Sequence, residues 1–150
     1  MIRKIIFCFT FIMLTNCGYE PIYIKNDTSN FSIQKFILSG DKNINRRITS
    51  LLNLKSKTEE NSQLILRFNS KKLLEVVSKD KAGNALIYKI TVSTNVQLNE
   101  NEKLIKEKNF RTSFTYNNSE NKFELLQYQK NIETNLVDKI TEEINIFLNT

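Results

Sequence analysis

ALIYKITVSTNVQL, residues 85–98, is the stretch in which a two-residue period is clearest. Every second residue from Leu86 to Leu98 is apolar, with Thr94 as the one polar member of that series. From residue 89 onward the intervening residues are all polar: Lys89, Thr91, Ser93, Asn95 and Gln97. Successive side chains of a strand point to opposite faces of a sheet, so this pattern predicts an antiparallel strand with one buried face and one polar face.

The chain before this strand is also extended. Residues 63–68 and 73–77 are rich in Leu and Val, and the break in their period at residues 70–72 predicts a bulge. The sequence between residues 80 and 84 is typical of a hairpin turn in which Gly83 takes a positive φ.

The chain after this strand turns at residues 99–102 and returns as a strand at residues 104–116. Alternation places Phe110, Phe114 and Tyr116 on one face of the returning strand. We therefore expect a three-stranded meander whose single apolar face needs a cover.

Two helical patterns can supply that cover. Asp41 is a predicted N-cap, and the apolar positions of residues 42–54 follow helical spacing: Ile44, Ile48, Leu51 and Leu52. From about residue 121 to residue 149, apolar residues recur every three or four positions without Pro or Gly: Phe123, Leu125, Leu126, Ile132, Leu136, Val137, Ile140, Ile144, Phe147 and Leu148. At 1.5 Å per residue the second helix would be roughly 40 Å long, enough to cross a whole sheet.

A first strand is predicted at residues 31–38, where the alternation slips between Ile33 and Phe36. The order is then strand, helix, three strands, helix. This order predicts an α+β two-layer sandwich, with two helices packed on one face of a four-stranded, mainly antiparallel sheet.

The N-terminus has the pattern of an export signal. Arg3 and Lys4 precede an apolar run from Ile5 to Leu14, which is too short to span a bilayer as a helix. Leu-Thr-Asn-Cys at residues 14–17 resembles a bacterial lipobox, in which the cysteine sulfur is acylated and the residue becomes the new N-terminus. We predict a signal peptide at residues 1–16, a lipidated N-terminus and tether at residues 17–30, and one domain at residues 31–150. The alternative is an ordinary secreted protein or an uncleaved anchor.

Composition argues against an enzyme. The chain has no histidine, and removal of the signal would discard Cys8 and leave Cys17 alone. We therefore expect no disulfide, no metal site and no histidine-based catalytic relay in the mature chain. With 3 Gly there is no glycine-rich phosphate loop, so no cofactor is expected. An envelope enzyme that uses carboxylates remains open, although no specific pair suggests one.

The charge is +6, and removal of the signal leaves 20 basic against 16 acidic residues. The polar face of the predicted sheet carries Arg67, Lys89 and Arg111. Counting outward from the turn near Glu100 places Lys89 nearly opposite Arg111, where a lipid phosphate could join them. A second basic group lies toward the first hairpin: Lys71, Lys72, Lys79 and Lys81. Both groups are candidate lipid-binding residues. The alternatives are solvated strand charges or neutralisation by a nearby carboxylate such as Glu75 or Glu107.

Cys17-Gly18-Tyr19-Glu20-Pro21-Ile22-Tyr23 resembles the Cys-Gly-aromatic-x-Pro-Leu-Tyr start of the LPS-assembly lipoproteins (LptE) of alphaproteobacteria. The predicted element order also matches the fold of that family. The resemblance implies a non-enzymatic lipoprotein, anchored by acyl chains in the inner leaflet of the outer membrane and facing the periplasm or the lumen of a barrel. It further implies that the protein plugs and helps to assemble an LptD-like β-barrel that delivers lipopolysaccharide to the outer leaflet.

The residue after the acylated cysteine also bears on location. Gly18, rather than Asp, fits release to the outer membrane under the lipoprotein sorting pattern that it resembles. An exported chain does not meet nucleic acid, so no such partner is expected. The alternative function is a periplasmic lipid-shuttling or transporter-auxiliary lipoprotein that acts without a barrel.

Overall fold

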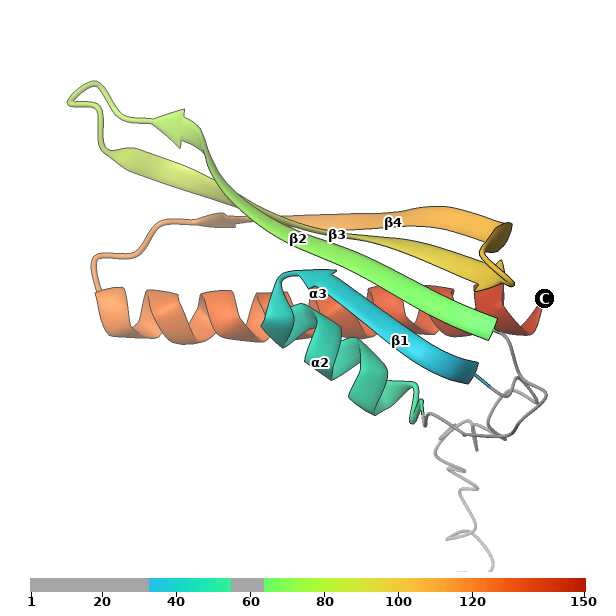
Figure 1. The fold of residues 1–150 in the computed structure, drawn as a ribbon. Coiled ribbons are helices and arrows are strands. Elements are labelled where there is room, and N and C mark those ends of the chain that lie inside the picture. The colour runs from blue at the N-terminus through green and yellow to red at the C-terminus, as the bar shows by residue number, and fades with distance from the viewer. Residues whose placement is uncertain (1–32, 55–63) are drawn as a thin grey trace, which may run out of the picture.

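Both helices lie on the same face of a four-stranded sheet (Figure 1). The computed structural model describes residues 33–54 and 64–150, so the predicted signal peptide and tether lie outside the described residues. The elements are β1 (Ile33–Gly40), α2 (Lys42–Leu51), β2 (Leu64–Lys79), β3 (Ala85–Glu100), β4 (Lys103–Asn117) and α3 (Lys122–Asn149). The strand order is β1-β2-β3-β4, with β1 parallel to β2 and the other pairs antiparallel. The predicted α+β sandwich is confirmed.

The apolar face of β3 forms the middle of the core, as its period predicts. Val92, Val96 and Leu98 are buried against the helices, and Thr94 is fully buried among them. From β4, Phe110 is buried at the position opposite Thr94. Phe110 also meets Phe147 of α3 edge to face, with ring centroids 5.7 Å apart.

The bulge predicted at residues 70–72 is wrong, because β2 continues through them without a register shift. The two-residue period is interrupted in sequence only because two polar residues of β2, Ser70 and Lys72, face the helices. Ser70 is fully buried and shares a hydrogen bond with Thr94, at 2.9 Å between the two Oγ atoms. Lys72 Nζ forms an ion pair with Glu133 of α3, at 2.8 Å. The register of β2 shifts later, between Val76 and Lys79.

The start of α2 is fixed by Asp41, as predicted. The Asp41 carboxylate accepts hydrogen bonds from the backbone N–H groups of Asn43 and Ile44, at 2.9 and 3.2 Å. The buried side of the helical segment is lined by Ile44, Asn45, Ile48 and Leu52. Leu51, predicted to belong to this side, is instead 42% exposed, because the buried side is centred between Ile48 and Asn45 and Leu51 lies at its margin.

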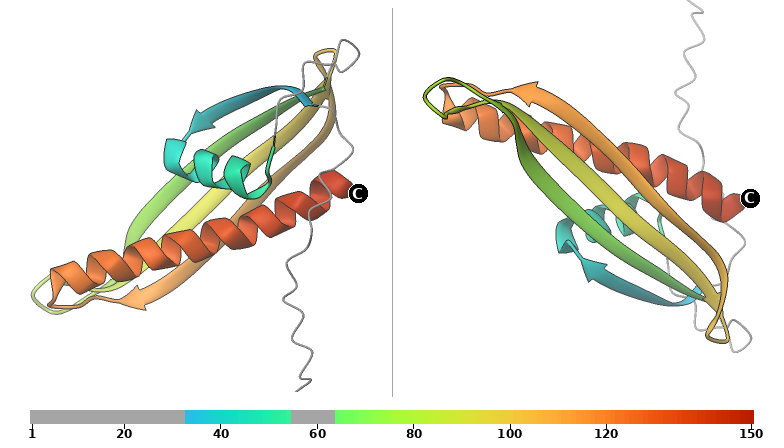
Figure 2. Two further views of the ribbon diagram at one scale, coloured as in Figure 1. Left: turned by 90° about the horizontal axis from the view of Figure 1, so that it is seen from below. Right: turned by 90° about the horizontal axis from the view of Figure 1, so that it is seen from above.

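α3 crosses the sheet diagonally over β3 and β4 (Figure 2). Its N-cap is Asn121, whose side-chain oxygen accepts hydrogen bonds from the backbone N–H groups of Phe123 and Glu124. The predicted stripe is buried along most of the helix, at Leu125, Ile132, Leu136, Val137, Ile140, Ile144 and Leu148. Phe123 and Leu126 are the exceptions, at 71% and 64% exposed.

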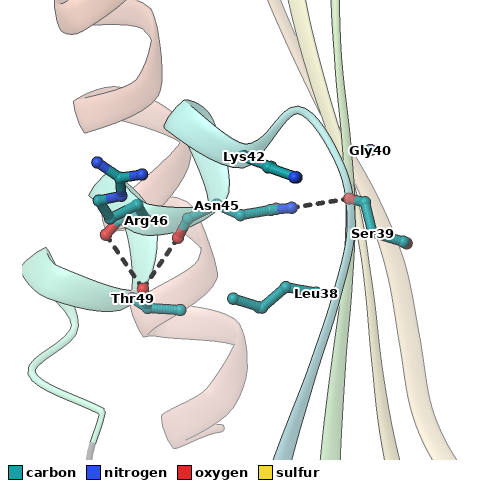
Figure 3. A pocket seen from close by; sticks show the side chains of 7 residues that line it. All are labelled: Leu38, Ser39, Gly40, Lys42, Asn45, Arg46 and Thr49. Carbon is teal, nitrogen blue, oxygen red and sulfur yellow. Dashed lines mark hydrogen bonds between the residues drawn. The ribbon is translucent and has the colours of Figure 1, made fainter.

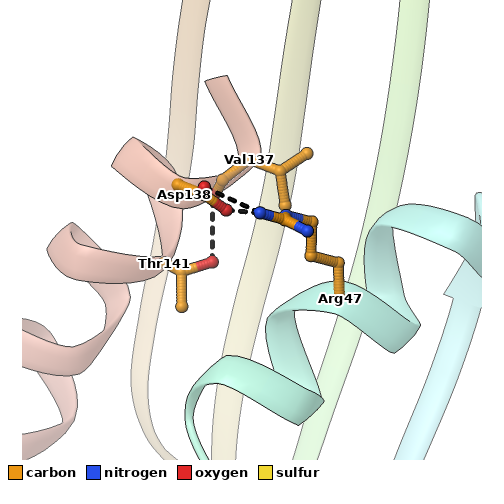
Figure 4. Close-up of polar contacts among 4 residues, drawn as sticks. All are labelled: Arg47, Val137, Asp138 and Thr141. Atoms are coloured by element: carbon orange, nitrogen blue, oxygen red, sulfur yellow. Dashed lines mark hydrogen bonds and ion pairs between the residues drawn. The ribbon is translucent and has the colours of Figure 1, made fainter. Parts of the chain in front are cut away.

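An ion pair joins the two helices (Figure 4). The Arg47 guanidinium donates to both carboxylate oxygens of Asp138, at 2.7 and 2.8 Å. The hydrogen bond to Asp138 raises the pKa of Arg47 above its ordinary value. Because both side chains are about 40% exposed, solvent screens the pair, and its main effect is to fix how α2 lies against α3.

Candidate functional site

The face of the sheet that carries no helix is the candidate site, and we call it the open face (Figure 2). Its side chains alternate with the buried ones along each central strand. Over most of its length it is polar, with these residues on β2, β3 and β4: Arg67, Asn69, Lys71, Lys89, Thr91, Ser93, Asn95, Gln97, Glu107, Asn109, Arg111, Ser113 and Thr115. The sequence therefore predicts correctly that Arg67, Lys89 and Arg111 share a face.

The predicted pairing of Lys89 with Arg111 is wrong. Arg111 lies opposite Ser93, whereas Lys89 lies between Thr115 on one side and Glu75 on the other. The turn between β3 and β4 consists only of Asn101 and Glu102, both at positive φ (48° and 68°), and the register shifts between Leu98 and Asn99. Together, the position of the turn and this register shift place Thr115, four residues beyond Arg111, opposite Lys89.

The register brings a different pair of cations together. Ser93 has Lys71 as its partner on β2 and Arg111 as its partner on β4. Neighbouring strands lie about 4.8 Å apart, so the two cations flank the Ser93 hydroxyl across roughly 10 Å. Both are exposed, and neither forms an ion pair within residues 33–54 and 64–150. We call Lys71, Ser93 and Arg111 the cationic row. Two cations with a hydroxyl between them are suited to a phosphate or a pair of phosphates.

Arg67 lies four residues along β2 from Lys71, in a shallow hollow of about 170 Å³. The hollow is lined by Ile37, Ser39, Arg67, Phe68, Asn69, Asn95 and Gln97. Beside it, Asn95 and Gln97 donate hydrogen bonds to one oxygen of Glu107, at 3.0 and 2.9 Å. The bonds from Gln97 and Asn95 lower the pKa of Glu107 below its ordinary value, so this carboxylate is ionised at neutral pH.

The basic group predicted near the first hairpin is divided between the two faces. Lys71 belongs to the open face, but Lys72 points to the helices and is bound to Glu133. Lys79 ends β2 and Lys81 lies in the turn of the hairpin. Of the predicted lipid-binding residues, Lys71 and Arg111 are therefore brought together, Arg67 and Lys89 lie on either side along the same face, and Lys72 is separate.

The sequence did not identify Ser93 as a site residue, and it did not show that Lys71 and Arg111 lie on either side of Ser93. Its polar alternation was visible, but its place between two cations depends on the register of three strands. A prediction from sequence would need the two-residue turn at Asn101–Glu102. Both residues take a positive φ, which suits a tight hairpin turn, but only Asn belongs to the residue types that commonly adopt it.

A second hollow, of about 390 Å³, lies between α2 and the outer edge of β1 (Figure 3). The Asn45 side chain reaches across to β1, and its Nδ2 donates to the Ser39 carbonyl at 2.7 Å. Its Oδ1 is buried without a hydrogen-bond partner among the described residues. Lys42, Arg46 and Thr49 complete the helical wall. This hollow is separate from the open face.

The described residues contain no cluster of acidic, histidine or cysteine side chains that could hold a metal ion. Neither helix in the described ranges is long and apolar enough to cross a membrane. Cys17, the predicted lipidation site, lies outside those ranges.

No family model matches the sequence, and no curated protein sequence matches it. The fold, in contrast, is similar to solved lipoprotein structures. The minor lipoprotein of Acinetobacter baumannii matches with a TM-score of 0.58 and 11% identity, over 79% of this chain and 92% of that one. The rare lipoprotein B of Shewanella oneidensis matches with a TM-score of 0.52 and 17% identity, over 73% of this chain and 92% of that one. The lipoprotein B of Nitrosomonas europaea matches with a TM-score of 0.51 and 12% identity, over 80% of this chain and 87% of that one.

These similarities establish the class of fold. The two-helix, four-stranded sandwich of this chain is one that bacterial lipoproteins share, and the match covers nearly the whole length of each of them.

Proposed function

We propose that the protein is an outer-membrane lipoprotein that plugs and helps to assemble an LPS-translocation β-barrel of the LptD type. The observation that carries the proposal is a lipoprotein-like fold preceded by the Cys17–Tyr23 motif of the LPS-assembly lipoproteins. The role is structural and requires no bond to be broken. It agrees with a chain that has no histidine and with an open face built mainly from amides, hydroxyls and cations, with Glu107 bound by two of the amides.

Within this function, the cationic row is the proposed contact for the phosphate groups of lipopolysaccharide. Lys71 and Arg111 are exposed and have no acidic partner in the described ranges, whereas Lys89 faces Glu75 and Lys72 is held by Glu133. Arg67 extends the positive charge toward β1. Charge-assisted hydrogen bonds from these groups suit a phosphorylated glycolipid.

The barrel is tested by co-purification. The full-length tagged protein is extracted from its own membranes in mild detergent, and the bound proteins are identified by mass spectrometry. We expect one outer-membrane barrel of the LPS-translocation type in near-equal amount, and its absence would refute the proposal. An unrelated tagged lipoprotein of the same membrane serves as the control for contaminating barrels.

The lipid contact is tested by charge reversal. Lys71→Glu combined with Arg111→Glu should weaken LPS binding at least about tenfold, because each lost charge-assisted bond contributes about 1.5–3 kcal/mol. Lys130→Glu with Lys139→Glu changes the net charge equally at exposed positions of α3 and should leave binding unchanged. Equal loss in both variants would mean that only net charge matters, and unchanged binding in the first would remove the cationic row from the account.

A further inference from the structure

The outer edge of the sheet at β1 lacks the usual protection against a further strand. Within the described ranges β1 has a neighbouring strand only on its β2 side, so alternate backbone N–H and C=O groups are directed outward. Residues 36–40, Phe-Ile-Leu-Ser-Gly, contain no charge, no proline and no register shift. The opposite edge strand, β4, has a register shift near its start and carries five charged residues: Lys103, Lys106, Glu107, Lys108 and Arg111. Charges and irregularities normally protect an edge, so β1 is the edge that can accept another strand.

The hollow between α2 and β1 lies beside this edge (Figure 3). Its volume of about 390 Å³ falls within the size range of ligand sites. Leu38 lies on the helix side of β1, as does its β2 partner Phe68, yet 47% of Leu38 is exposed in the hollow. An apolar side chain of an added strand could therefore pack against Leu38.

A buried hydrogen-bond acceptor also lines the hollow. Asn45 is only 2% exposed, and its Nδ2 donates to the Ser39 carbonyl at 2.7 Å, which fixes the orientation of the amide. The Oδ1 atom of the same amide has no hydrogen-bond partner among the described residues. Leaving a buried acceptor without a donor is costly, and a backbone N–H group of a bound peptide would remove that cost.

The helical wall of the hollow is cationic. Lys42 and Arg46 line it, both are exposed, and neither forms an ion pair within residues 33–54 and 64–150. Figure 3 shows the Lys42 side chain directed toward β1. The neighbouring Asp41 carboxylate is already bound to the N–H groups of Asn43 and Ile44. A complementary occupant therefore carries an acidic side chain on the side that faces α2.

A second copy of this chain does not supply that acidic group. Pairing of two β1 strands would bring together two edges whose one charged residue, Lys35, is basic. Each copy would also add its own Lys42 and Arg46, and like charges placed together are unfavourable. The charges thus favour a different, acidic chain as the occupant.

We propose that the outer edge of β1 binds an extended acidic peptide segment of another protein as an added strand. Main-chain hydrogen bonds to the edge, together with an N–H group donated to Asn45 Oδ1, provide the affinity. The side chains that face α2 provide the specificity, with an acidic one toward Lys42 and Arg46 and an apolar one against Leu38. This site is separate from the cationic row, and the inference depends neither on the proposed barrel nor on lipopolysaccharide.

The test is peptide binding to the full-length protein in mild detergent, measured by fluorescence anisotropy. The probe is fluorescein-labelled Thr-Val-Thr-Glu-Thr-Val-Thr with a blocked C-terminus, in which the Glu and both Val side chains share one face of a strand. Its sequence is the same in both directions, so it serves for parallel or antiparallel addition. We expect saturable binding that becomes at least about tenfold weaker when Lys replaces Glu. No binding, or equal binding of the two peptides, would overturn the inference.

Charge reversal in the protein should exchange this preference. With Lys42→Glu and Arg46→Glu combined, the Lys peptide should bind better than the Glu peptide. Lys130→Glu with Lys139→Glu changes the net charge equally at exposed positions of α3 and should keep the original preference. Folding of both variants is checked by circular dichroism. An unchanged preference in the first variant, or the same change in both, would show that the acidic residue does not bind at this wall.

Methylation of the peptide backbone tests the strand addition itself. In an added strand, alternate N–H groups point toward β1 and the others point away from it. N-methyl groups on the second and sixth residues, or on the third and fifth, should therefore differ at least about tenfold in their effect on binding. Equal effects of the two pairs would mean that the peptide does not pair with the edge, and the inference would be wrong.

Discussion

Gly40→Ala is expected to lower the free energy of unfolding by about 2–5 kcal/mol. Gly40 has a φ of +79°, a conformation that L side chains rarely adopt. A Cβ there would overlap the carbonyl oxygen of Ser70, the partner of Gly40 on β2. That oxygen is held in place because it accepts the Asp41 N–H at 2.8 Å. Urea unfolding followed by far-UV circular dichroism measures the loss.

Gly83→Ala is the matched control for Gly40→Ala. Gly83 has a similar φ of +89°, but a Cβ there would meet no atom within 4 Å. Its replacement should therefore cost only the backbone strain, about 1–2 kcal/mol. The difference between the two variants isolates the overlap with Ser70. Equal losses would mean that the junction of β1 and α2 can shift to accept a side chain.

The parts of the fold that the sequence predicts well are those set by local chemistry. The alternation of residues 85–98 predicts which side chains of β3 are buried from Ile90 to Leu98, because the helices cover that face of the strand there. Asp41 caps its helix as predicted. The predicted slip near Ile33 is also present, as a register shift between Ile33 and Lys35.

The prediction errors occur where the structure of a residue depends on a partner that is distant in sequence. Ser70 and Lys72 look like interruptions of β2 until Thr94 and Glu133, far away in sequence, are seen to satisfy them. Burial of a polar group is acceptable when it is hydrogen-bonded, so no property of residues 70–72 alone could reveal the unbroken strand.

The candidate site depends on the same kind of information. That Arg67, Lys89 and Arg111 share a face follows from alternation, but which cations are neighbours depends on the turn after β3 and on the register shift between Leu98 and Asn99. A shift of four residues exchanges Lys89 for Ser93 opposite Arg111 and brings Lys71 into the same row. The hypothesis of two neighbouring cations that could bind an anion is kept, but the pair is Lys71 and Arg111 instead of Lys89 and Arg111.

Cys17→Ser is expected to abolish palmitate incorporation, the largest effect of any single substitution on where the protein resides. The proposed acylation needs a thiol, whose pKa near 8.5 gives far more of the nucleophilic form than a serine hydroxyl can supply. Two or three acyl chains, at about 0.8 kcal/mol per buried methylene, hold a protein stably, whereas one chain binds only marginally. The measurement is incorporation of labelled palmitate into the immunoprecipitated chain.

Palmitate labelling is a sharper readout than membrane fractionation for this substitution. An unprocessed Cys17→Ser chain would keep the apolar run from Ile5 to Leu14, which could itself hold the precursor on a membrane. Cys8→Ser is the matched control, because Cys8 lies within that run and would be removed with it. Full labelling of Cys8→Ser with none in Cys17→Ser assigns the acyl chains to Cys17. Label retained in Cys17→Ser would mean that another residue carries the acyl chains, and the assignment of the lipid anchor to Cys17 would be wrong.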